Sequence, residues 1–225
     1  MDGNGRWAKV QGLPRGEGHR RGAEAAERLI RLAGEEKLCR HLTLFAFSTE
    51  NWDRPPEEVD LLIGLLEEFI AQKVEELSEA GVRLDVVGQR ELFPASLSAE
   101  VARVEELTRD NQGLQLHVAL SFGGRWAVME AVRGAVRAAR ENCLQAEAVD
   151  EPFVRRLLPT ANLPDVDLVI RTAGEQRLSN FLLWETAYAE LYFTPVLWPD
   201  FDEAAFLDAL ETYQGRQRSF GRVSS

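Results

Sequence analysis

The sequence predicts a single α/β domain with a mainly parallel central sheet and helices on both faces. Short apolar runs that suit buried strands alternate with longer segments whose apolar residues recur at helical spacing. No repeat, linker or low-complexity segment interrupts this alternation. With 225 residues, of which 45% are hydrophobic, the chain can bury one substantial core, so residues 1–225 are assigned to one domain.

The predicted elements follow one another in a regular order. Strands are predicted at residues 42–47, 84–87, 114–122, 166–170 and 191–193. Helices are predicted at residues 18–36, 57–80, 98–110, 150–158, 181–189 and 202–218, with one more running from the Gly123-Gly124-Arg125 turn to about residue 142.

The helix predicted at residues 57–80 is the longest amphipathic segment. One side of it carries Val59, Leu62, Ile63, Leu66, Phe69, Ile70, Val74 and Leu77. We expect this side to pack in the core, and the alternative is a specialised lipid-contacting face.

Composition excludes several classes of protein. The net charge of −11 argues against a nucleic-acid binder, and any anion site must be built locally from arginines and backbone amides. Cys39 and Cys143 form no motif, so we expect two free thiols in a reducing compartment. No apolar run reaches the roughly 18–20 residues of a membrane span, and no signal peptide is visible. We therefore expect a soluble cytoplasmic protein.

Polar clusters follow three of the predicted strands, at Ser48, Gly123 and Arg171. The carboxyl ends of parallel strands lie at one edge of a sheet, where α/β proteins bind their ligands. If these strand ends share an edge, the clusters converge on one cleft.

Residues 167–181 form the most informative of these clusters. A buried strand stops at Arg171, a loop with Gly174 and Arg177 follows, and Ser179-Asn180 suits the N-cap of a helix. Helix N-termini and arginine forks both bind phosphate oxygens. The pattern therefore indicates a phosphate or diphosphate grip made by Arg171, Arg177 and Ser179. The alternative is a solvated loop in which the arginines pair with Glu175 and Glu185.

The first residues are rich in turn formers. Gly3 and Gly5 on either side of Asn4 allow a turn whose N–H groups point inward as an anion nest. Asp2 is a hard oxygen ligand and Arg6 a partner for phosphate. Such turns are common, so this segment alone identifies no site.

Taken together, the motifs resemble the cis-prenyltransferase family, the undecaprenyl diphosphate synthases and their relatives. The matching stretches, in order, are DGNGRWA at residues 2–8, GHRRGAEA at 18–25, FSTENWDRP at 47–55, SFGGR at 121–125, the long run at 167–201, and RQRSFG at 216–221. The resemblance implies a homodimer, a six-stranded parallel sheet and a hydrophobic tunnel between helices and sheet. It also implies condensation of isopentenyl diphosphate with an allylic diphosphate such as farnesyl diphosphate, with Mg²⁺, to a polyprenyl diphosphate, most simply undecaprenyl diphosphate for a cell-wall lipid carrier. A lipid product implies transient membrane contact on release.

The matching positions imply a role for each site residue. The substrate-binding residues implied for the allylic diphosphate are Gly3, Asn4, Gly5, Arg6, Arg15 and Arg54; those for isopentenyl diphosphate are Arg171, Arg177, Leu178 and Ser179. Trp7 is also implied to bind substrate. Asp2 and Glu190 are the implied magnesium carboxylates, and Asp2 and Asn51 the implied catalytic residues. Around the substrate stand His19, Ser48, Thr49, Glu50 and Trp52. Asparagine is a poor base, so Asn51 is expected to position a water or a diphosphate oxygen that takes the proton.

Taken singly, several of these residues have ordinary explanations. His19 would be a surface residue at a helix start, Asn51 a turn residue, Asp2 a terminal acid and Glu190 a solvated charge at a helix end. Their occurrence together and in order favours the functional reading.

The sequence departs from the family pattern at two places. In the family a buried strand precedes DGNGRWA, whereas here only Met1 does. Either the true start lies upstream or the chain lacks one strand of the sheet, and we expect a form with about ten further upstream residues to be more stable and more active. Relatives often have tyrosine where this chain has Phe122.

Two other functions remain open. One is a short-chain cis-prenyl diphosphate synthase, and the other a non-catalytic partner subunit of the same fold. No DDxxD cluster and no GxxxxGK[ST] loop occurs, which disfavours a helical trans-prenyl synthase and a nucleotide phosphotransferase.

Overall fold

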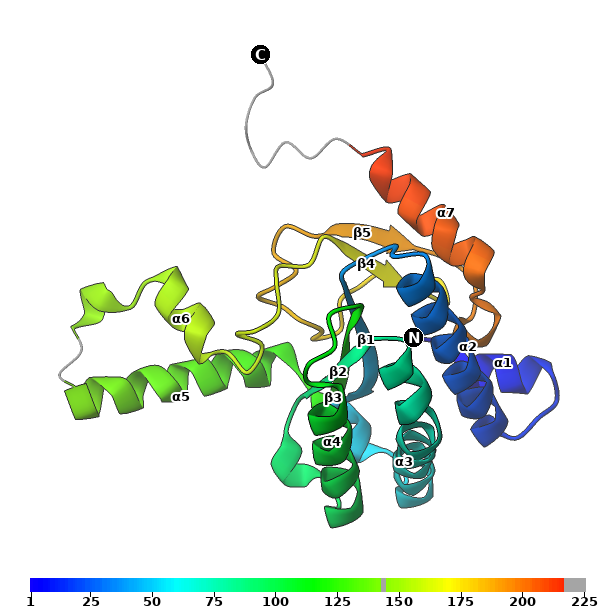
Figure 1. The fold of residues 1–225 in the computed structure, drawn as a ribbon, viewed down its shortest axis with the longest axis horizontal. Helices are drawn as coiled ribbons and strands as arrows, with labels where there is room; N and C mark the ends of the chain where they lie inside the picture. The colour runs from blue at the N-terminus through cyan, green and yellow to red at the C-terminus, as the bar shows by residue number, and fades with distance from the viewer. Residues whose placement is uncertain (143–144, 217–225) are drawn as a thin grey trace.

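A computed structural model describes residues 1–142 and 145–216 (Figure 1). The helices are α1 (Asn4–Val10), α2 (Arg15–Glu35), α3 (Pro56–Glu79), α4 (Ala95–Thr108), α5 (Gly124–Asn142), α6 (Glu151–Leu157) and α7 (Glu203–Gln214). The strands are β1 (His41–Ser48), β2 (Arg83–Val87), β3 (Gln115–Phe122), β4 (Leu168–Arg171) and β5 (Glu190–Phe193). Cys143 and positions 217–221 of the predicted C-terminal motif lie outside the described residues.

The strands form two parallel sheets. One sheet has the order β1-β3-β2 and the other pairs β4 with β5. The predicted α/β class with parallel strands is confirmed. The single six-stranded sheet that the resemblance implied is not seen, because the part of the chain that the structure describes holds five strands and divides them between two sheets.

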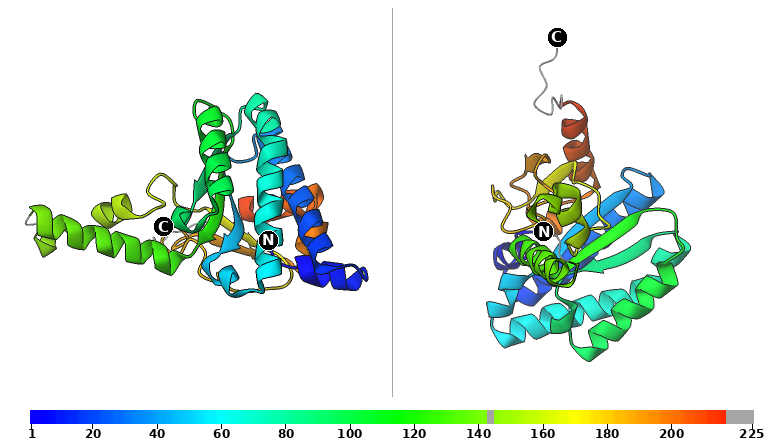
Figure 2. Two further views of the ribbon diagram at one scale, coloured as in Figure 1. Left: turned by 90° about the horizontal axis from the view of Figure 1, so that it is seen from below. Right: turned by 90° about the vertical axis from the view of Figure 1, so that its left-hand side faces the viewer.

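Helices cover the larger sheet on one face, and a helical arm leaves from the other. Helices α2, α3 and α4 stand side by side over β1, β2 and β3 (Figure 2). On the opposite face, the first turns of α5 pack against Val87, Ala119 and Phe122 through Ala127 and Ala131. The rest of α5 projects from the molecule with α6 beside it (Figures 1 and 2).

Glycines set how closely the first two helices approach. A Cβ at Gly18 would lie 2.0 Å from the Asn4 carbonyl oxygen, and one at Gly22 would lie 2.4 Å from Asn4 Oδ1. Any side chain at these positions would push α2 off the start of α1. The GHRRG stretch therefore presses α2 onto the residues that follow Asp2.

Several predicted boundaries are corrected. Residues 4–10 are a helix rather than an open turn, and α2 starts at Arg15, directly after Pro14, instead of near residue 18. The helix predicted at residues 181–189 does not form. Ser179, Asn180 and Leu182 have φ of 48°, 63° and 39°, and turns follow up to residue 188. The apolar side chains of this run pack in a hydrophobic cluster without forming a helix, and Leu182 is 1% exposed.

Among the described residues, no helix combines the length and the apolar character that crossing a bilayer requires.

Candidate active site

One cavity of about 1310 Å³ collects most of the predicted site residues. Its lining includes Asp2, Asn4, His19, Ser48, Glu50, Asn51, Arg54, Arg171, Arg177, Leu178 and Ser179. The cavity runs between β1 and β4 along the length of both strands, reaches the loops that follow their carboxyl ends, and extends toward α7. The predicted convergence of polar clusters is therefore confirmed for the β1 and β4 ends.

Arg171 is a buried side chain that several hydrogen bonds hold in place on one side of this cleft. It ends β4, and only 9% of it is exposed. Its Nε donates to Asp2 Oδ2 at 3.2 Å, and its Nη1 donates to Ser179 Oγ at 2.9 Å and to the carbonyl oxygen of Arg177. Arg171, Arg177 and Ser179 are hereafter the strand-end cluster. The side chains of the predicted grip lie together, but the helix N-terminus expected beside them is absent, because Ser179 and Asn180 adopt left-handed conformations.

The backbone of Asp2 is anchored to the end of β4. Its N–H donates to Thr172 Oγ1 at 2.9 Å, and its carbonyl oxygen accepts from the Trp198 N–H at 3.0 Å. Gly3 has φ 112°, and a Cβ there would lie 3.0 Å from Leu197 Cδ2, so only glycine fits the turn into α1. This turn leaves the Asp2 carboxylate beside Arg171 with 39% of its side chain exposed.

Glu175 bridges two of the predicted phosphate-binding arginines. Its Oε1 lies 2.8 Å from Arg6 Nη2, and its Oε2 pairs with Arg177 Nη1. The hydrogen bond from Arg177 holds the pKa of the Glu175 carboxyl below its usual value. The solvated-loop alternative is thus correct for Glu175 and wrong for Glu185, which is 3% exposed and accepts from Thr160 Oγ1. A carboxylate that bridges two arginines marks a place where a phosphate would find the same partners.

The other side of the cleft is built on helix starts. Glu58, in the first turn of α3, accepts from Arg54 Nη1 at 2.9 Å and lies 3.1 Å from Arg15 Nε and 3.7 Å from His19 Nε2. These four residues, Arg15, His19, Arg54 and Glu58, are hereafter the helix-start cluster. The His19 side chain is 10% exposed, and its burial lowers its pKa, so the ring is neutral at pH 7. Gly5 lets Arg15 lie over α1, since a Cβ at Gly5 would be 3.3 Å from Arg15 Nε.

Sequence reasoning missed Glu58. The available signal was its spacing: it follows Arg54 by four residues, and the two prolines between them mark the start of the helix whose first turn holds Glu58.

The loop after β1, residues 48–54, holds Asn51 by a reciprocal cap. The Ser48 N–H donates to Asn51 Oδ1 at 3.1 Å, while the Ser48 side chain accepts from the Asn51 backbone. Trp52 Nε1 donates to Ser121 Oγ at 2.8 Å, which ties this loop to the end of β3. The amide of Asn51 is thereby oriented by its own turn, which suits a group that positions another molecule.

Trp7 and Glu190 lie outside the cleft lining. Trp7 Nε1 donates to Asp200 Oδ1 at 2.7 Å and fastens α1 to the turn at Trp198–Asp200. Glu190 begins β5 opposite Leu168, whereas Arg171, beside Asp2, pairs with Phe193 at the other end of the ladder. Glu190 instead accepts from Arg216 Nη1 at 2.8 Å. The expectation that Asp2 and Glu190 share a metal is not met within this chain, and no cluster of three metal-binding side chains occurs in residues 1–142 and 145–216.

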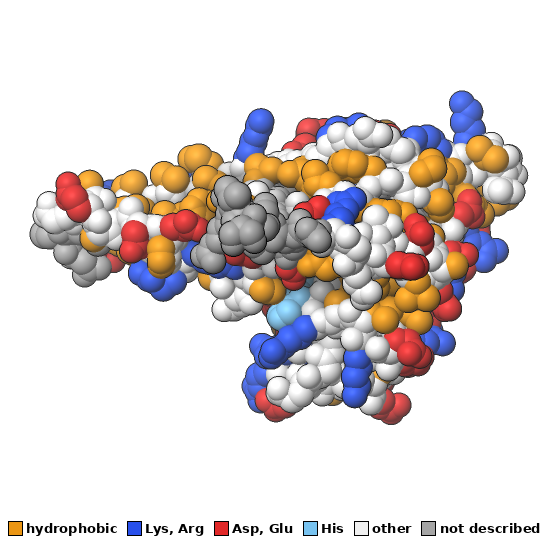
Figure 3. All heavy atoms as spheres, turned by 90° about the horizontal axis from the view of Figure 1, so that it is seen from above, with side chains coloured by type: hydrophobic (Ala, Val, Ile, Leu, Met, Phe, Trp, Pro, Cys, Tyr) orange, Lys and Arg blue, Asp and Glu red, His pale blue; other side chains and the backbone are white. Residues whose placement is uncertain are grey.

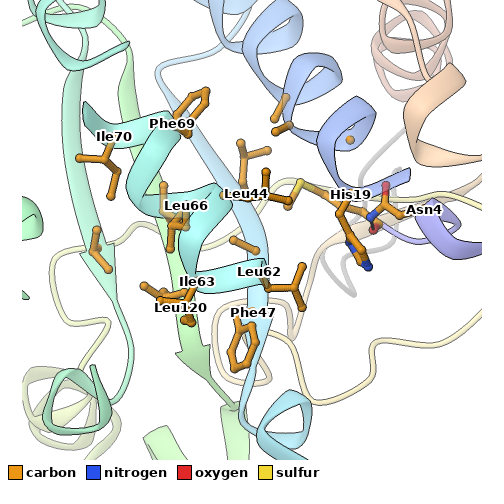
Figure 4. Close-up of a pocket in the computed structure, with 18 of the residues that line it drawn as sticks. Asn4, His19, Leu44, Phe47, Leu62, Ile63, Leu66, Phe69, Ile70 and Leu120 are labelled. Carbon is orange, nitrogen blue, oxygen red and sulfur yellow. Dashed lines mark hydrogen bonds between the residues drawn. The ribbon is translucent and has the colours of Figure 1, made fainter. Parts of the chain in front are cut away.

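An apolar pocket continues inward from the polar cleft. It lies between α2, α3 and the larger sheet, and its lining is almost wholly apolar (Figure 4). In Figure 4, Asn4 and His19 mark one end, and Phe69 and Ile70 lie toward the other. Asn4, His19, Leu44 and Leu62 line both the pocket and the cleft, so the two spaces are continuous. The predicted tunnel is confirmed, and the apolar side of α3 both packs in the core and lines this pocket.

Comparison with known proteins gives consistent results. The sequence pattern of a family described as "Putative undecaprenyl diphosphate synthase" matches residues 1–221. The chain is 48% identical to an isoprenyl transferase of Aquifex aeolicus over 99% of this chain and 94% of the relative. It is 42% identical to a ditrans,polycis-undecaprenyl-diphosphate synthase ((2E,6E)-farnesyl-diphosphate specific) of Vibrio cholerae, over 98% of this chain and 88% of the relative.

A solved structure matches the fold closely. It is lavandulyl diphosphate synthase from Lavandula x intermedia in complex with dimethylallyl diphosphate, with a TM-score of 0.94 and 36% sequence identity over 99% of this chain and 95% of that one.

Proposed function

The chain belongs to the undecaprenyl diphosphate synthase family of isoprenyl transferases, and from this premise we propose that it condenses isopentenyl diphosphate with an allylic diphosphate such as farnesyl diphosphate. The observation that carries the proposal is the junction of two cation clusters with one apolar pocket. Two diphosphates need two anion sites, and a growing hydrocarbon needs an apolar space beside them.

In this proposal the helix-start cluster, with Gly3, Gly5 and Arg6, holds the allylic diphosphate, and the strand-end cluster holds isopentenyl diphosphate. Arg15 and Arg54 both pair with Glu58, whose Oε1 lies 3.7 Å from Nε2 of His19, a residue that lines the apolar pocket. The buried Arg171 presents a fixed fork of donors. The allylic carbon would then face the double bond of isopentenyl diphosphate across the cleft.

Asn51 is proposed to position the group that takes the proton from the new allylic product. Its amide oxygen is occupied by Ser48, which fixes the plane of the amide. The acceptor would be a diphosphate oxygen or a water, because a neutral amide is a weak base.

Magnesium fits one of the two predicted carboxylates. Mg²⁺ is bound through one or two carboxylates together with substrate phosphates, and Asp2 offers a partly exposed carboxylate beside Arg171. Glu190 does not fit the same ion in this chain. The chemistry that the ion supplies when bound is neutralisation of the charge that develops on the departing diphosphate.

We further propose a homodimer through the arm. Along α5, Met129, Val132 and Val136 are each about half exposed at a spacing of three and four residues. Figure 3 shows hydrophobic side chains exposed along the arm. Such a stripe on a helix that leaves the body of the protein fits a second copy. Sedimentation of the wild type and of Val132→Asp would test it, with a shift from dimer to monomer expected for the variant.

The product is proposed to be a long polyprenyl diphosphate, with a short-chain product as the second candidate. The long-chain reading is supported by the family description and by the Vibrio cholerae relative. The short-chain reading is supported by the lavandulyl diphosphate synthase structure. A non-catalytic partner subunit fits less well, since both cation clusters and Asn51 are in place.

The test is incubation with labelled isopentenyl diphosphate, farnesyl diphosphate and Mg²⁺, followed by separation of products by chain length. A ladder ending near C55 would support the long-chain synthase, and a single short product the second candidate. Absence of any product under conditions where an active family member elongates would contradict the proposal.

A further inference from the structure

The side chain of Asn180 joins the ends of three strands. Its Nδ2 donates to Glu50 Oε1 at 2.8 Å, in the loop that follows β1. Its Oδ1 accepts from the Arg125 N–H at 2.8 Å, and its carbonyl oxygen accepts from the Gly124 N–H at 2.6 Å, both just after β3. Asn180 itself belongs to the loop that follows β4. No role for it was predicted beyond that of a helix cap, and no such helix exists.

The backbone at this position favours asparagine. Asn180 has φ 63°, and asparagine enters the left-handed region more readily than other residues with a side chain, glycine aside. Gly123 leaves just enough room for it, because a Cβ there would lie 2.7 Å from both Asn180 Nδ2 and Thr49 Oγ1. The conformation and the free space both serve the contact between the loops.

The amide lies one residue away from each of two proposed functional groups. Ser179 precedes it and accepts from Arg171 in the strand-end cluster. Glu50, its partner, precedes Asn51. A single amide therefore links the loop that presents Ser179 to the loop that presents Asn51.

The charge on Glu50 strengthens this link. Burial alone would raise the pKa of Glu50, but the hydrogen bonds that it accepts, that of Asn180 first among them, bring the pKa below its usual value. Glu50 is therefore ionised at neutral pH, and a hydrogen bond to an ionised acceptor is stronger than one between neutral groups.

We propose that Asn180 is a positioning residue that locks residues 177–182 to residues 48–54 and so fixes isopentenyl diphosphate relative to Asn51. The assignment rests on the proposed function for its catalytic consequence. The locking of the two loops does not depend on that function. Asn180 touches no reacting atom in this account and acts through Ser179 and Glu50.

The sharpest test is an exchange of the two partners. In Asn180→Asp, a carboxylate faces Glu50 in place of the amide N–H, while the acceptor for the Arg125 N–H is kept. The double variant Asn180→Asp, Glu50→Gln restores a hydrogen bond in the opposite direction, from Gln Nε2 to the Asp carboxylate. We expect the single variant to lose roughly tenfold or more in kcat/KM for isopentenyl diphosphate, and the second substitution to recover several-fold of that loss.

A merely structural role would not give this pattern. Asn111 is the matched control, since its Nδ2 donates to the carbonyl oxygens of Ser78 and Val82 far along the chain from the cleft. Asn111→Asp should lower the melting temperature without changing the KM for isopentenyl diphosphate. Asn180→Asp should raise that KM and lower kcat, while the dissociation constant of farnesyl diphosphate, measured by direct binding, changes less than about twofold.

Hydrogen exchange separates the two proposals. In Asn180→Gly, which keeps the left-handed backbone and loses the amide, residues 48–54 and 177–182 should both exchange faster without any substrate present. Unchanged exchange in both loops, or a double variant no better than Asn180→Asp, would overturn the inference. Faster exchange in a protein whose wild type forms no prenyl product would leave the loop lock standing and contradict the proposed function instead.

Discussion

The two cation clusters of the cleft hold their charges in different ways. In the strand-end cluster, Arg171 is 9% exposed and is held by Asp2, by Ser179 and by a backbone carbonyl. In the helix-start cluster, the side chains of Arg15 and Arg54 are 60% and 32% exposed, and both depend on one carboxylate, that of Glu58.

The difference shows how one cleft can combine a rigid site with an adjustable one. A buried guanidinium with three fixed partners keeps one geometry, and any change leaves some of its buried N–H groups without acceptors. Exposed arginines around a shared carboxylate can move with little cost, because solvent screens their pairs. We expect the isopentenyl side to be rigid and the allylic side, where the hydrocarbon changes length at every step, to be adaptable.

The largest expected effect comes from Arg171→Lys. Lysine keeps the charge but cannot reach Asp2, Ser179 and the Arg177 carbonyl oxygen at once, because it lacks the planar fork. We expect kcat/KM for isopentenyl diphosphate to fall roughly a hundredfold, as measured by steady-state kinetics. Arg177→Lys, on a side chain that is 60% exposed, should lose less. Equal losses of kcat/KM in the two variants would contradict the distinction between the rigid Arg171 and the mobile Arg177.

The next effect is expected from Glu58→Gln. Without the carboxylate, Arg15 and Arg54 lose the partner that holds them together, so the KM for the allylic diphosphate should rise about tenfold while that for isopentenyl diphosphate stays within about twofold. Glu76→Gln is the control, since Glu76 also pairs with two cations, Arg31 and Lys73, but away from the cleft. A rise in both KM values would show that the two clusters are not separable.

A smaller effect is expected on stability as the pH falls. Burial lowers the pKa of His19 in the folded protein, so the unfolded chain binds its proton first. The stability from neutral His19 is therefore fully present above the unfolded pKa of about 6.5 and is lost as the pH falls toward the lowered folded pKa. Melting temperatures of the wild type and His19→Gln at pH 7.5 and 5.5 should show the smaller drop in the variant. An equal drop in melting temperature in both proteins would show that groups other than His19 cause the pH dependence.

The smallest effect on rate is expected at the inner end of the pocket. Phe69→Ala opens space where the hydrocarbon would stop, toward the end of the pocket away from Asn4 and His19 (Figure 4). The longest product should gain one or more isoprene units, while the rate of the first condensation changes less than about threefold. Separating the products of the wild type and the variant by chain length would measure this gain. A shorter product would contradict the assignment of Phe69 to the inner end of the pocket.

The periodic parts of the chain could be predicted from the sequence, and the cleft loops only in part. The strands at β1 and β3 and the helix α3 carry long apolar patterns that few other folds satisfy. The run after Asn180 has the same apolar character, but left-handed turns at Ser179, Asn180 and Leu182 break it. Those turns depend on contacts with the start of α5, since a Cβ at Gly124 would lie 2.9 Å from the Leu183 nitrogen. Such contacts between distant segments leave no local signal.

The site shows the same division. Motif order predicted Arg171, Ser179 and Asn51 as site residues, and all three line the cleft. Glu58 was missed and Asn180 was predicted only as a helix cap, because each contacts another site residue or site loop through its side chain, and a carboxylate on a helix or an asparagine in a loop has many ordinary explanations. Glu190 was expected to share a metal with Asp2. Its distance from Asp2 depends on its position along the β4–β5 ladder, which the register of the two strands sets.

The continuity of the cleft with the apolar pocket bears on whether the enzyme releases intermediates between successive additions. After each condensation under the proposed function, the diphosphate of the lengthened chain stands at the strand-end cluster and must occupy the helix-start cluster before the next addition. His19 and Arg54 of the helix-start cluster and all three residues of the strand-end cluster line one cavity, so the transfer crosses a shared space while the hydrocarbon stays in the apolar pocket. Intermediates would then remain bound through successive rounds. Diluting a primed reaction into excess unlabelled primer should leave the label in full-length product.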